Sequence, residues 1–142
     1  MPTLHLKISP PQTPQRHRQL AEALTRLTAH HLSKRAEVTA VMVDDLPAAR
    51  WFVGGKAVTG ATAFLEISVT QGTNTQAQKA AFIDAAFAEL QNQLCGADPS
   101  NDVPGLEPAS YVIVRELPAT DWGYSGQTQA MRASLREATL SL

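Results

Sequence analysis

Apolar and polar residues alternate near the start of the chain. Between Thr3 and Ile8 the apolar side chains occupy every second position, a period that predicts a β-strand with one buried face. Thr13-Pro14 follows as a typical helix N-cap and first helical position. Apolar positions then recur at helical spacing and predict a helix that ends near Lys34. The stripe that we expect this helix to bury consists of Leu20, Leu24, Leu27 and His31.

The order of elements is completed by a second strand and is then repeated. Val38–Val43 reads as that strand, and a turn with the sequence Leu-Pro-Ala follows it. The second copy has a strand at 64–69, a helix, and a further strand beginning at Tyr111. The helix stripe expected in this copy consists of Ile83, Phe87, Leu90 and Leu94. Each copy then carries Leu-Pro-Ala, a tryptophan and an aromatic–glycine segment, which indicates an internal duplication.

The duplication leads us to interpret residues 1–142 as one domain. Repeat one spans residues 2–55, repeat two spans residues 63–126, and a tail at 127–142 contains a short predicted helix. Repeat two also has an extra loop between Gly96 and Pro108, which is rich in turn-forming residues.

Two βαβ units predict a particular α+β architecture. Each unit should cross over with the right-handed sense and leave its two strands parallel. Side by side, the units give a four-stranded mixed sheet with both helices on one face. The opposite face carries apolar residues that nothing in the chain covers, which is unfavourable for a single layer. We therefore expect the subunits to associate in a closed cyclic assembly.

Composition and charge narrow the range of functions. The 142 residues carry 12 Lys and Arg against 13 Asp and Glu, a net charge of −1, so no basic field favours nucleic acid as a partner. No apolar run is long enough to span a membrane, and no leader segment is evident. The single cysteine, Cys95, suits a reducing compartment, and we expect a cytoplasmic protein.

Several kinds of site lack the residue spacing that they need. The histidines are scattered and Cys95 has no partner at ligand spacing, so the sequence predicts no metal site. Neither Ser68 nor Ser125 has acid–base companions at a recognisable spacing. Gly54-Gly55 lacks the flanking pattern of a phosphate-binding loop and reads as a hairpin turn.

Pro2 is the candidate with distinctive chemistry. Removal of Met1 would leave Pro2 as a free secondary amine at the start of the first strand. An apolar pocket or a nearby cation would lower the pKa of that amine towards neutrality. A base with such a pKa suits general acid–base catalysis.

The fused βαβ repeat with proline directly after Met1 resembles the tautomerase superfamily. That family includes 4-oxalocrotonate tautomerase (4-OT), 5-carboxymethyl-2-hydroxymuconate isomerase, macrophage migration inhibitory factor, malonate semialdehyde decarboxylase and the 3-chloroacrylic acid dehalogenases. The resemblance covers about residues 2–126 and implies a homotrimer with the N-terminal proline in a pocket near a subunit boundary. It further implies a small-molecule carboxylic acid as substrate and no cofactor.

The resemblance assigns roles to individual residues. Pro2 falls on the catalytic proline, and its counterpart in repeat two is about Ala63, so we expect one site per chain. Trp51 and Val53 fall on pocket-wall residues of 4-OT. Three other residues fall on the pocket lysine, pocket tyrosine and rim aromatic of the migration-inhibitory-factor branch: Lys34, Tyr111 and Tyr124.

The carboxylate-binding arginines of 4-OT are not matched. One position reads about Gln12 or Thr73, and the other reads Ala40 or Tyr111. The arginine pair of the dehalogenase and decarboxylase branches, expected near Thr70 and Thr73, is also missing. Arg115 lies on the same strand face as Tyr111 and could bind the carboxylate or form a surface salt bridge.

These observations predict a cofactor-independent tautomerase or isomerase for a small 2-oxo or 2-hydroxy (enol) carboxylic acid, with Pro2 as the general base. Two alternatives stay open. A protonated Pro2 could serve as the acid of a hydratase, dehalogenase or decarboxylase, although the missing arginines count against this. A non-catalytic trimeric binding protein of the same fold is the third reading.

Overall fold

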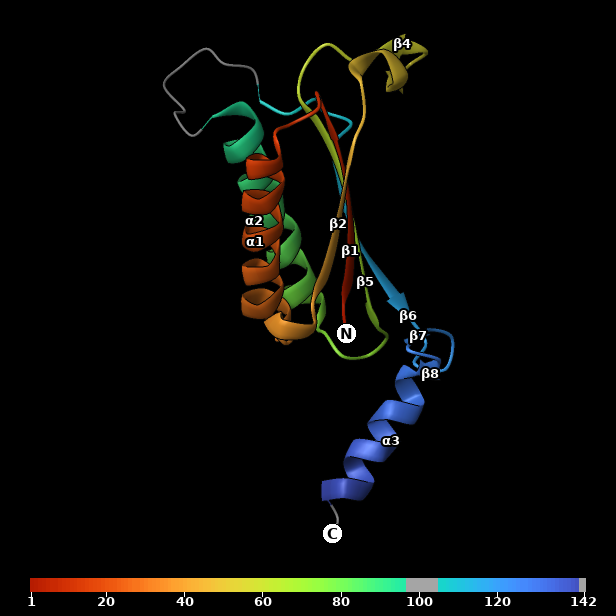
Figure 1. Cartoon of the computed structure of the whole chain (residues 1–142). Helices are drawn as coiled ribbons and strands as arrows, with labels where there is room; N and C mark the ends of the chain where they lie inside the picture. Colours follow the sequence, from red (N-terminus) through yellow and green to blue (C-terminus); the bar gives the residue numbers. More distant parts are fainter. Residues whose placement is uncertain (97–104, 141–142) are drawn as a thin grey trace.

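The computed structural model describes residues 1–96 and 105–140. Its main elements form two βαβ units, whose helices lie side by side against one face of a sheet (Figure 1). The first unit comprises β1 (Thr3–Ser9), α1 (Pro14–Leu32) and β2 (Ala40–Asp45). The second comprises β5 (Thr62–Thr70), α2 (Gln76–Cys95) and β6 (Tyr111–Leu117). The predicted loop between Gly96 and Pro108 falls largely outside the described residues.

The sheet has the strand order β2-β1-β5-β6. The pairs β1–β2 and β5–β6 are parallel, and the central pair β1–β5 is antiparallel with Leu6 opposite Leu65. This arrangement confirms the predicted four-stranded mixed sheet with both helices on one face.

A short hairpin follows each βαβ unit. The first hairpin joins β3 (Phe52–Val53) to β4 (Lys56–Ala57), and the second joins β7 (Gly123–Tyr124) to β8 (Gln127–Thr128). Both turns use left-handed backbone, at Gly54-Gly55 in the first and at Ser125-Gly126 in the second. The amide that follows each hairpin donates to the carbonyl of the tryptophan ahead of it, Val58 to Trp51 and Gln129 to Trp122, both over 2.9 Å. The duplication therefore extends to the hydrogen bonds of the loops.

Threonine caps fix where the two long helices begin. The Thr13 hydroxyl accepts a hydrogen bond from the Arg16 amide (3.1 Å). In α2 the Thr75 hydroxyl accepts from the Gln78 amide (3.1 Å), and the Gln78 side chain accepts from the Thr75 amide (2.9 Å). Such reciprocal capping satisfies two amides that would otherwise lack partners inside the helix.

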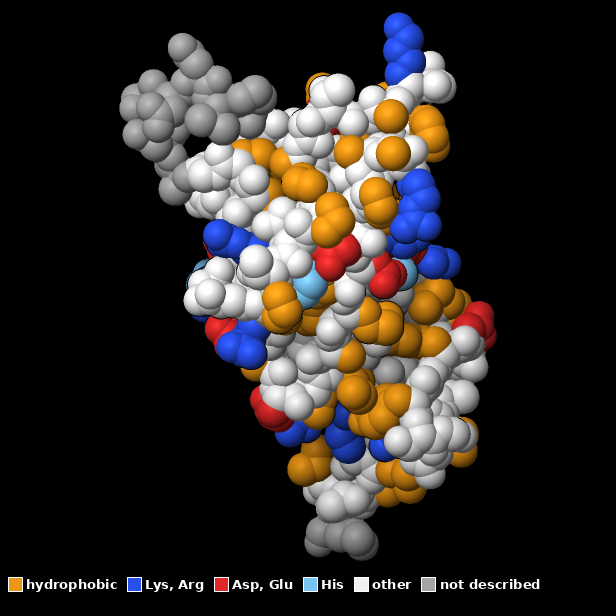
Figure 2. Space-filling model, turned by 45° about the horizontal axis from the view of Figure 1, so that its top comes forward, with side chains coloured by type: hydrophobic (Ala, Val, Ile, Leu, Met, Phe, Trp, Pro, Cys, Tyr) orange, Lys and Arg blue, Asp and Glu red, His pale blue; other side chains and the backbone are white. Residues whose placement is uncertain are grey.

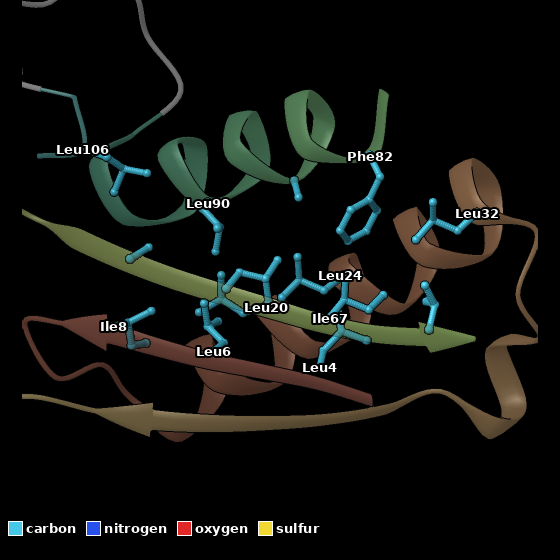
Figure 3. Close-up of a cluster of buried hydrophobic side chains, with 14 residues drawn as sticks. Leu4, Leu6, Ile8, Leu20, Leu24, Leu32, Ile67, Phe82, Leu90 and Leu106 are labelled. Carbon is cyan, nitrogen blue, oxygen red and sulfur yellow. The ribbon is translucent and has the colours of Figure 1, made fainter. Parts of the chain in front are cut away.

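The core lies between the sheet and the helices (Figure 3). Leu4, Leu6 and Ile8 are fully buried, as the alternation predicts. In the stripe predicted for the second helix, Leu90 is buried, and Phe87 and Leu94 pack against the core while partly buried. Ile83 does not follow the prediction: it is 38 % exposed, and Phe82 is fully buried in its place. The buried positions of α2 are Phe82, Ala86 and Leu90, which recur every fourth residue along one helical face.

The first helix departs from its predicted stripe more mildly. Its fully buried positions include Leu20 and Leu24 as expected, whereas Leu27 and His31 are only half-buried. Thr28 and Leu32 are buried instead. Thr28 tolerates burial because its hydroxyl donates to the Leu24 carbonyl over 2.7 Å.

Within the described residues, no layer of the chain covers the opposite face of the sheet. Met42 and Tyr111 are 51 % and 59 % exposed there. Charged side chains share this face in pairs: His5 with Asp44 (2.6 Å) and Arg115 with Glu66 (2.7 Å). Within residues 1–96 and 105–140, no helix has the length and apolar character that crossing a membrane requires.

Candidate active site

Pro2 lies at one end of the sheet, where β1 begins. It is buried, and its carbonyl accepts a hydrogen bond from the Ala40 amide over 3.0 Å. The sheet register places Thr3 opposite Ser68, and Ser68 opposite Arg115. The N-terminus and the β7–β8 hairpin are therefore at the same end of the molecule, as Figure 1 shows.

The candidate residues divide between the two ends of the sheet. Three candidates lie at the same end as Pro2. Lys34 follows the end of α1, Arg115 lies in the second half of β6, and Tyr124 lies in β7. Trp51, Val53 and Tyr111 lie at the opposite end: Tyr111 pairs with Phe64, which lies opposite Lys7, and the first hairpin follows the far end of β2. One chain does not bring these three residues to its own Pro2.

The amino group at the N-terminus has an unusual environment. Its pKa lies below the ordinary value because it is partly buried and because Arg136, Lys34, Arg132 and Arg35 place positive charge near it. In the structure this amine belongs to Met1, and the Pro2 nitrogen is part of a peptide bond. After loss of Met1 the amine would move to Pro2, which is more deeply buried than Met1.

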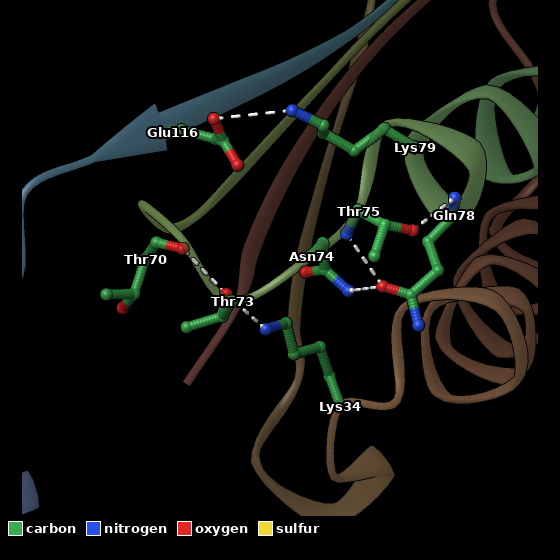
Figure 4. A network of polar contacts seen from close by, with 8 residues as sticks. All are labelled: Lys34, Thr70, Thr73, Asn74, Thr75, Gln78, Lys79 and Glu116. Atoms are coloured by element: carbon green, nitrogen blue, oxygen red, sulfur yellow. Dashed lines mark hydrogen bonds and ion pairs between the residues drawn. The ribbon is translucent and has the colours of Figure 1, made fainter.

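Lys34 is held by the loop between β5 and α2 (Figure 4). Its ammonium donates to the Thr73 hydroxyl over 2.8 Å, and that hydroxyl donates to the Thr70 carbonyl over 2.6 Å. Burial lowers the pKa of Lys34, and the carboxylate of Glu116 opposes this effect. Glu116 itself pairs with Lys79 at 3.4 Å. Lys34 is therefore a fixed, partly desolvated cation near the amine.

Two arginines of the C-terminal helix α3 (Gln129–Leu140) also lie near the N-terminal amine, at the Pro2 end of the sheet. The Arg132 guanidinium stacks on the Tyr124 ring, 3.7 Å from its centroid, and its Nη2 donates to the Tyr124 carbonyl over 2.9 Å. Arg136 follows one turn later and is exposed. Figure 2 shows Lys and Arg side chains next to apolar ones near the C-terminal end.

Sequence reasoning missed Arg132 and Arg136. It predicted a helix over 128–138 and treated it as a tail, although the i, i+4 spacing places both arginines on one helical face. It also missed Arg35, which pairs with Glu37 at 2.8 Å. A search for unassigned cations beyond repeat two would have found the α3 pair.

Arg115 has one of the two roles that the sequence left open. Its side chain is 55 % exposed, and its Nη1 lies 2.7 Å from Glu66 Oε1 on the uncovered sheet face. Much of its charge is thus engaged by Glu66. In contrast, among residues 1–96 and 105–140, Lys34, Arg132 and Arg136 have no carboxylate within ion-pair distance.

Val53 and Tyr111 meet at the other end of the sheet. They line a hollow of about 550 Å³ together with Lys56 and Glu107. The residue of repeat two that corresponds to Pro2 is Ala63, which lies inside the continuous chain of β5 and has no free amine. This end therefore lacks the base that the Pro2 end can offer.

The geometry at the Pro2 end suits proton transfer on an anion. A desolvated amine among cations is deprotonated more readily than an ordinary amine, so it can accept a proton near neutral pH. Fixed positive charges can stabilise a carboxylate and the enolate that develops beside it. In the part of the chain that the structure describes, no three His, Cys, Asp or Glu residues converge as metal ligands.

Comparison with known proteins agrees with this description. The tautomerase family model, described as tautomerase enzyme, matches residues 2–61. A wild-type fused 4-OT, an asymmetric trimer, is 25 % identical with a TM-score of 0.74, and the match covers 92 % of this chain and 98 % of that one. No curated protein matches the chain in sequence.

Two other solved structures share the fold. A macrophage migration inhibitory factor-like protein from Entamoeba histolytica is 20 % identical with a TM-score of 0.66, over 89 % of this chain and 97 % of that one. A malonate semialdehyde decarboxylase inhibited by 3-bromopropiolate is 13 % identical with a TM-score of 0.69, over 93 % and 96 % of the two chains. Residues 2–61 therefore match the tautomerase family, and the chain as a whole shares the fold of fused, two-repeat 4-OT.

Proposed function

We propose that the chain is an enzyme, a cofactor-independent tautomerase that converts the enol and keto forms of a small 2-hydroxy or 2-oxo carboxylic acid. The amine of Pro2, freed by removal of Met1, is its general base. The observation that carries this proposal is the environment of the N-terminal amine, which is partly buried and surrounded by the cations Lys34, Arg35, Arg132 and Arg136.

The reaction needs a single proton to be moved. The Pro2 amine takes the proton from the enol hydroxyl, and the electron pair of the broken O–H bond forms the carbonyl. The electron pair of the carbon–carbon double bond then takes the proton from the Pro2 ammonium at the neighbouring carbon. The base is regenerated, and Lys34 stabilises the negative charge that develops on the substrate oxygens.

The surroundings that lower the pKa of the Met1 amine would also act on the Pro2 amine once Met1 is removed, and they favour a base over an acid. The alternative chemistries of this superfamily, hydration, dehalogenation and decarboxylation, would use a protonated Pro2. Nearby cations and burial both disfavour the protonated amine. The similarity to a malonate semialdehyde decarboxylase is too distant in sequence to favour that activity.

We further propose that the working form is a homotrimer. Solved structures of fused 4-OT are trimers, and the uncovered sheet face exposes Met42 and Tyr111. In such an assembly the second candidate group, Trp51, Val53 and Tyr111, could reach a Pro2 only from a neighbouring subunit.

Three measurements test this proposal: the intact mass of the protein, its turnover of an enol substrate, and the turnover of Pro2 variants. Intact mass of the natively expressed protein should lack Met1, and the protein should accelerate ketonisation of phenylenolpyruvate at neutral pH. Pro2→Ala replaces a secondary amine by a primary one of different basicity and should lower kcat by roughly 10²–10⁴-fold, the usual contribution of general-base catalysis. Pro2→Gly offers a second primary amine and should be impaired in the same way.

A retained Met1 would overturn the assignment of the base. Unchanged turnover in a well-folded Pro2→Ala protein would do the same. Absence of turnover in a protein that still binds carboxylates would favour the non-catalytic binding protein.

A further inference from the structure

The start of α3 is tied to the body of the chain by several independent contacts. The amides of Gln129 and Ala130 donate to the carbonyls of Trp122 and Ala119, each over 2.9 Å. The Thr128 hydroxyl accepts from the Met131 amide over 3.0 Å and caps the helix. These bonds fix the direction in which α3 leaves the hairpin at the Pro2 end of the sheet.

Arg132 adds a side-chain tie to these backbone contacts. Its guanidinium carbon lies over the Tyr124 ring, 3.7 Å from the centroid, and its Nη2 donates to the Tyr124 carbonyl. Arg–aromatic stacking of this kind favours a fixed orientation of the planar guanidinium. The Arg132 Nε is buried and has no hydrogen-bond partner among the described residues. Arg132 therefore holds α3 on the hairpin and is left with unused donor capacity.

Arg136 is placed differently. It lies one turn beyond Arg132 on the same face of α3, is exposed, and has no carboxylate within ion-pair distance in the described chain. Of the four cations near the N-terminal amine, it has the largest electrostatic effect on that amine. Lys34 approaches the same amine from the end of α1, so the amine has cations on two separate elements.

We propose that α3 is part of the active site, with Arg136 binding the carboxylate of the substrate and Arg132 acting as a positioning residue that holds the helix on Tyr124. This assignment rests on the proposed function only in taking the Pro2 end as the site. The ligand class is a small organic carboxylate.

Binding of a non-reacting carboxylate tests this assignment without depending on catalysis. Benzoate is the probe, and benzamide is its neutral counterpart of the same shape. Titration of the full-length protein by NMR should show that benzoate binds more tightly than benzamide. Arg136→Gln should weaken benzoate binding by about tenfold, the loss expected for a charge-assisted hydrogen bond, and should leave benzamide binding unchanged. Arg18→Gln, an exposed arginine on α1, is the matched control and should alter neither.

Kinetics separates a binding role from a positioning role. Arg136→Gln should raise KM for phenylenolpyruvate with a smaller effect on kcat, because the carboxylate is bound in both the ground state and the transition state. Tyr124→Leu removes the ring beneath Arg132 and should weaken benzoate binding although Arg136 is intact. Arg132→Lys keeps the charge but not the planar guanidinium, so it should retain only part of the wild-type affinity for benzoate.

The outcomes that would overturn the proposal differ from those that would overturn the proposed function. Equal affinity of the wild-type and Arg136→Gln proteins for benzoate would exclude Arg136 as the carboxylate-binding residue, whatever the fate of Pro2. Equal affinity of the wild-type protein for benzoate and benzamide would exclude a carboxylate site at this end. Loss of activity in Pro2→Ala with benzoate binding intact would leave the assignment of Arg136 standing.

Discussion

The Ala40 amide donates a hydrogen bond to the Pro2 carbonyl over 3.0 Å, and this bond extends the β1–β2 ladder one residue beyond Thr3. Residue 2 is therefore fixed by the backbone of the sheet. Because the bond uses the carbonyl, it survives any substitution of the Pro2 side chain, so loss of activity in Pro2→Ala can be attributed to the amine.

The pH dependence of turnover should report the cations around that amine. A base acts in its deprotonated form, so kcat/KM should rise with pH through the pKa of the amine. Lys34→Gln removes one of the charges that lower this pKa, and the midpoint of the profile should move to higher pH. The variant leaves unchanged the other nearby charged residues of β6, namely Arg115 and the carboxylate Glu116 that acts on Lys34.

A matched control for this experiment lies at the far end of the sheet. Arg18 is exposed near the start of α1, and Arg18→Gln should leave the midpoint unchanged. A profile for Lys34→Gln that coincides with the wild-type profile would show that Lys34 does not act on the base.

The assembly can be tested through the uncovered sheet face. Light scattering should give a mass of three chains of 15.3 kDa each. Met42→Lys places a charge on this face, where burial without a partner is costly, and should shift the mass towards the single chain. Ile83→Lys, on the outer side of α2, should leave the assembly intact. A wild-type protein that stays monomeric at micromolar concentration would contradict the trimer.

Much of the fold could be predicted because the chain encodes it twice. Strand alternation from Leu4 to Ile8 is a local signal, and the repeated Leu-Pro-Ala turns fix the order of the elements. The phase of α2 could not be predicted in the same way, since Ile83 and Phe82 are both apolar. The structure buries Phe82 and leaves Ile83 38 % exposed, and the apolar pattern alone does not distinguish between these two neighbours.

The candidate site was predicted only in part, for a physical reason. Pro2 stood out in the sequence because removal of Met1 would free its amine, and Lys34 was assigned by resemblance to a pocket lysine. The approach of Arg132 and Arg136 depends on a helix outside both repeats, and its direction is set by the hydrogen bonds at Trp122 and Ala119. Trp51 was assigned to the Pro2 pocket by resemblance. Within one chain it lies beyond the far end of β2, so its predicted role requires the Pro2 of a neighbouring subunit.

The helix caps should make a measurable contribution to stability. Thr75→Ala removes the hydroxyl that accepts from the Gln78 amide, which is one half of the reciprocal cap, and should lower the free energy of unfolding by about 1 kcal/mol. Thr75→Ser keeps the hydroxyl and should recover most of the loss. Urea denaturation of the three proteins measures the difference, and equal midpoints for Thr75→Ala and the wild type would contradict the role of the cap.

Asp45 should make the stability of the first repeat depend on pH. Its carboxylate accepts a hydrogen bond from the Gln12 amide (3.0 Å) and lies 2.8 Å from the His17 ring, so it ties the end of β2 to the start of α1. Burial by itself would raise the pKa of Asp45, but the bonds from Gln12 and His17 outweigh it and hold the pKa below its ordinary value.

The sign of the effect follows from this direction. A carboxylate whose pKa is lower in the folded state than in the unfolded state stabilises the fold above its unfolded pKa, and the stabilisation is lost as the pH falls through the folded pKa. The wild-type protein should therefore exceed Asp45→Asn in free energy of unfolding at neutral pH, and the difference should shrink in acid. Asp84→Asn, at an exposed position on α2, controls for the loss of one negative charge and should show a smaller effect. Urea denaturation at a series of pH values measures the difference, and a gap between wild type and Asp45→Asn that stays constant from neutral to acid pH would show that the ionised carboxylate is not what stabilises this junction.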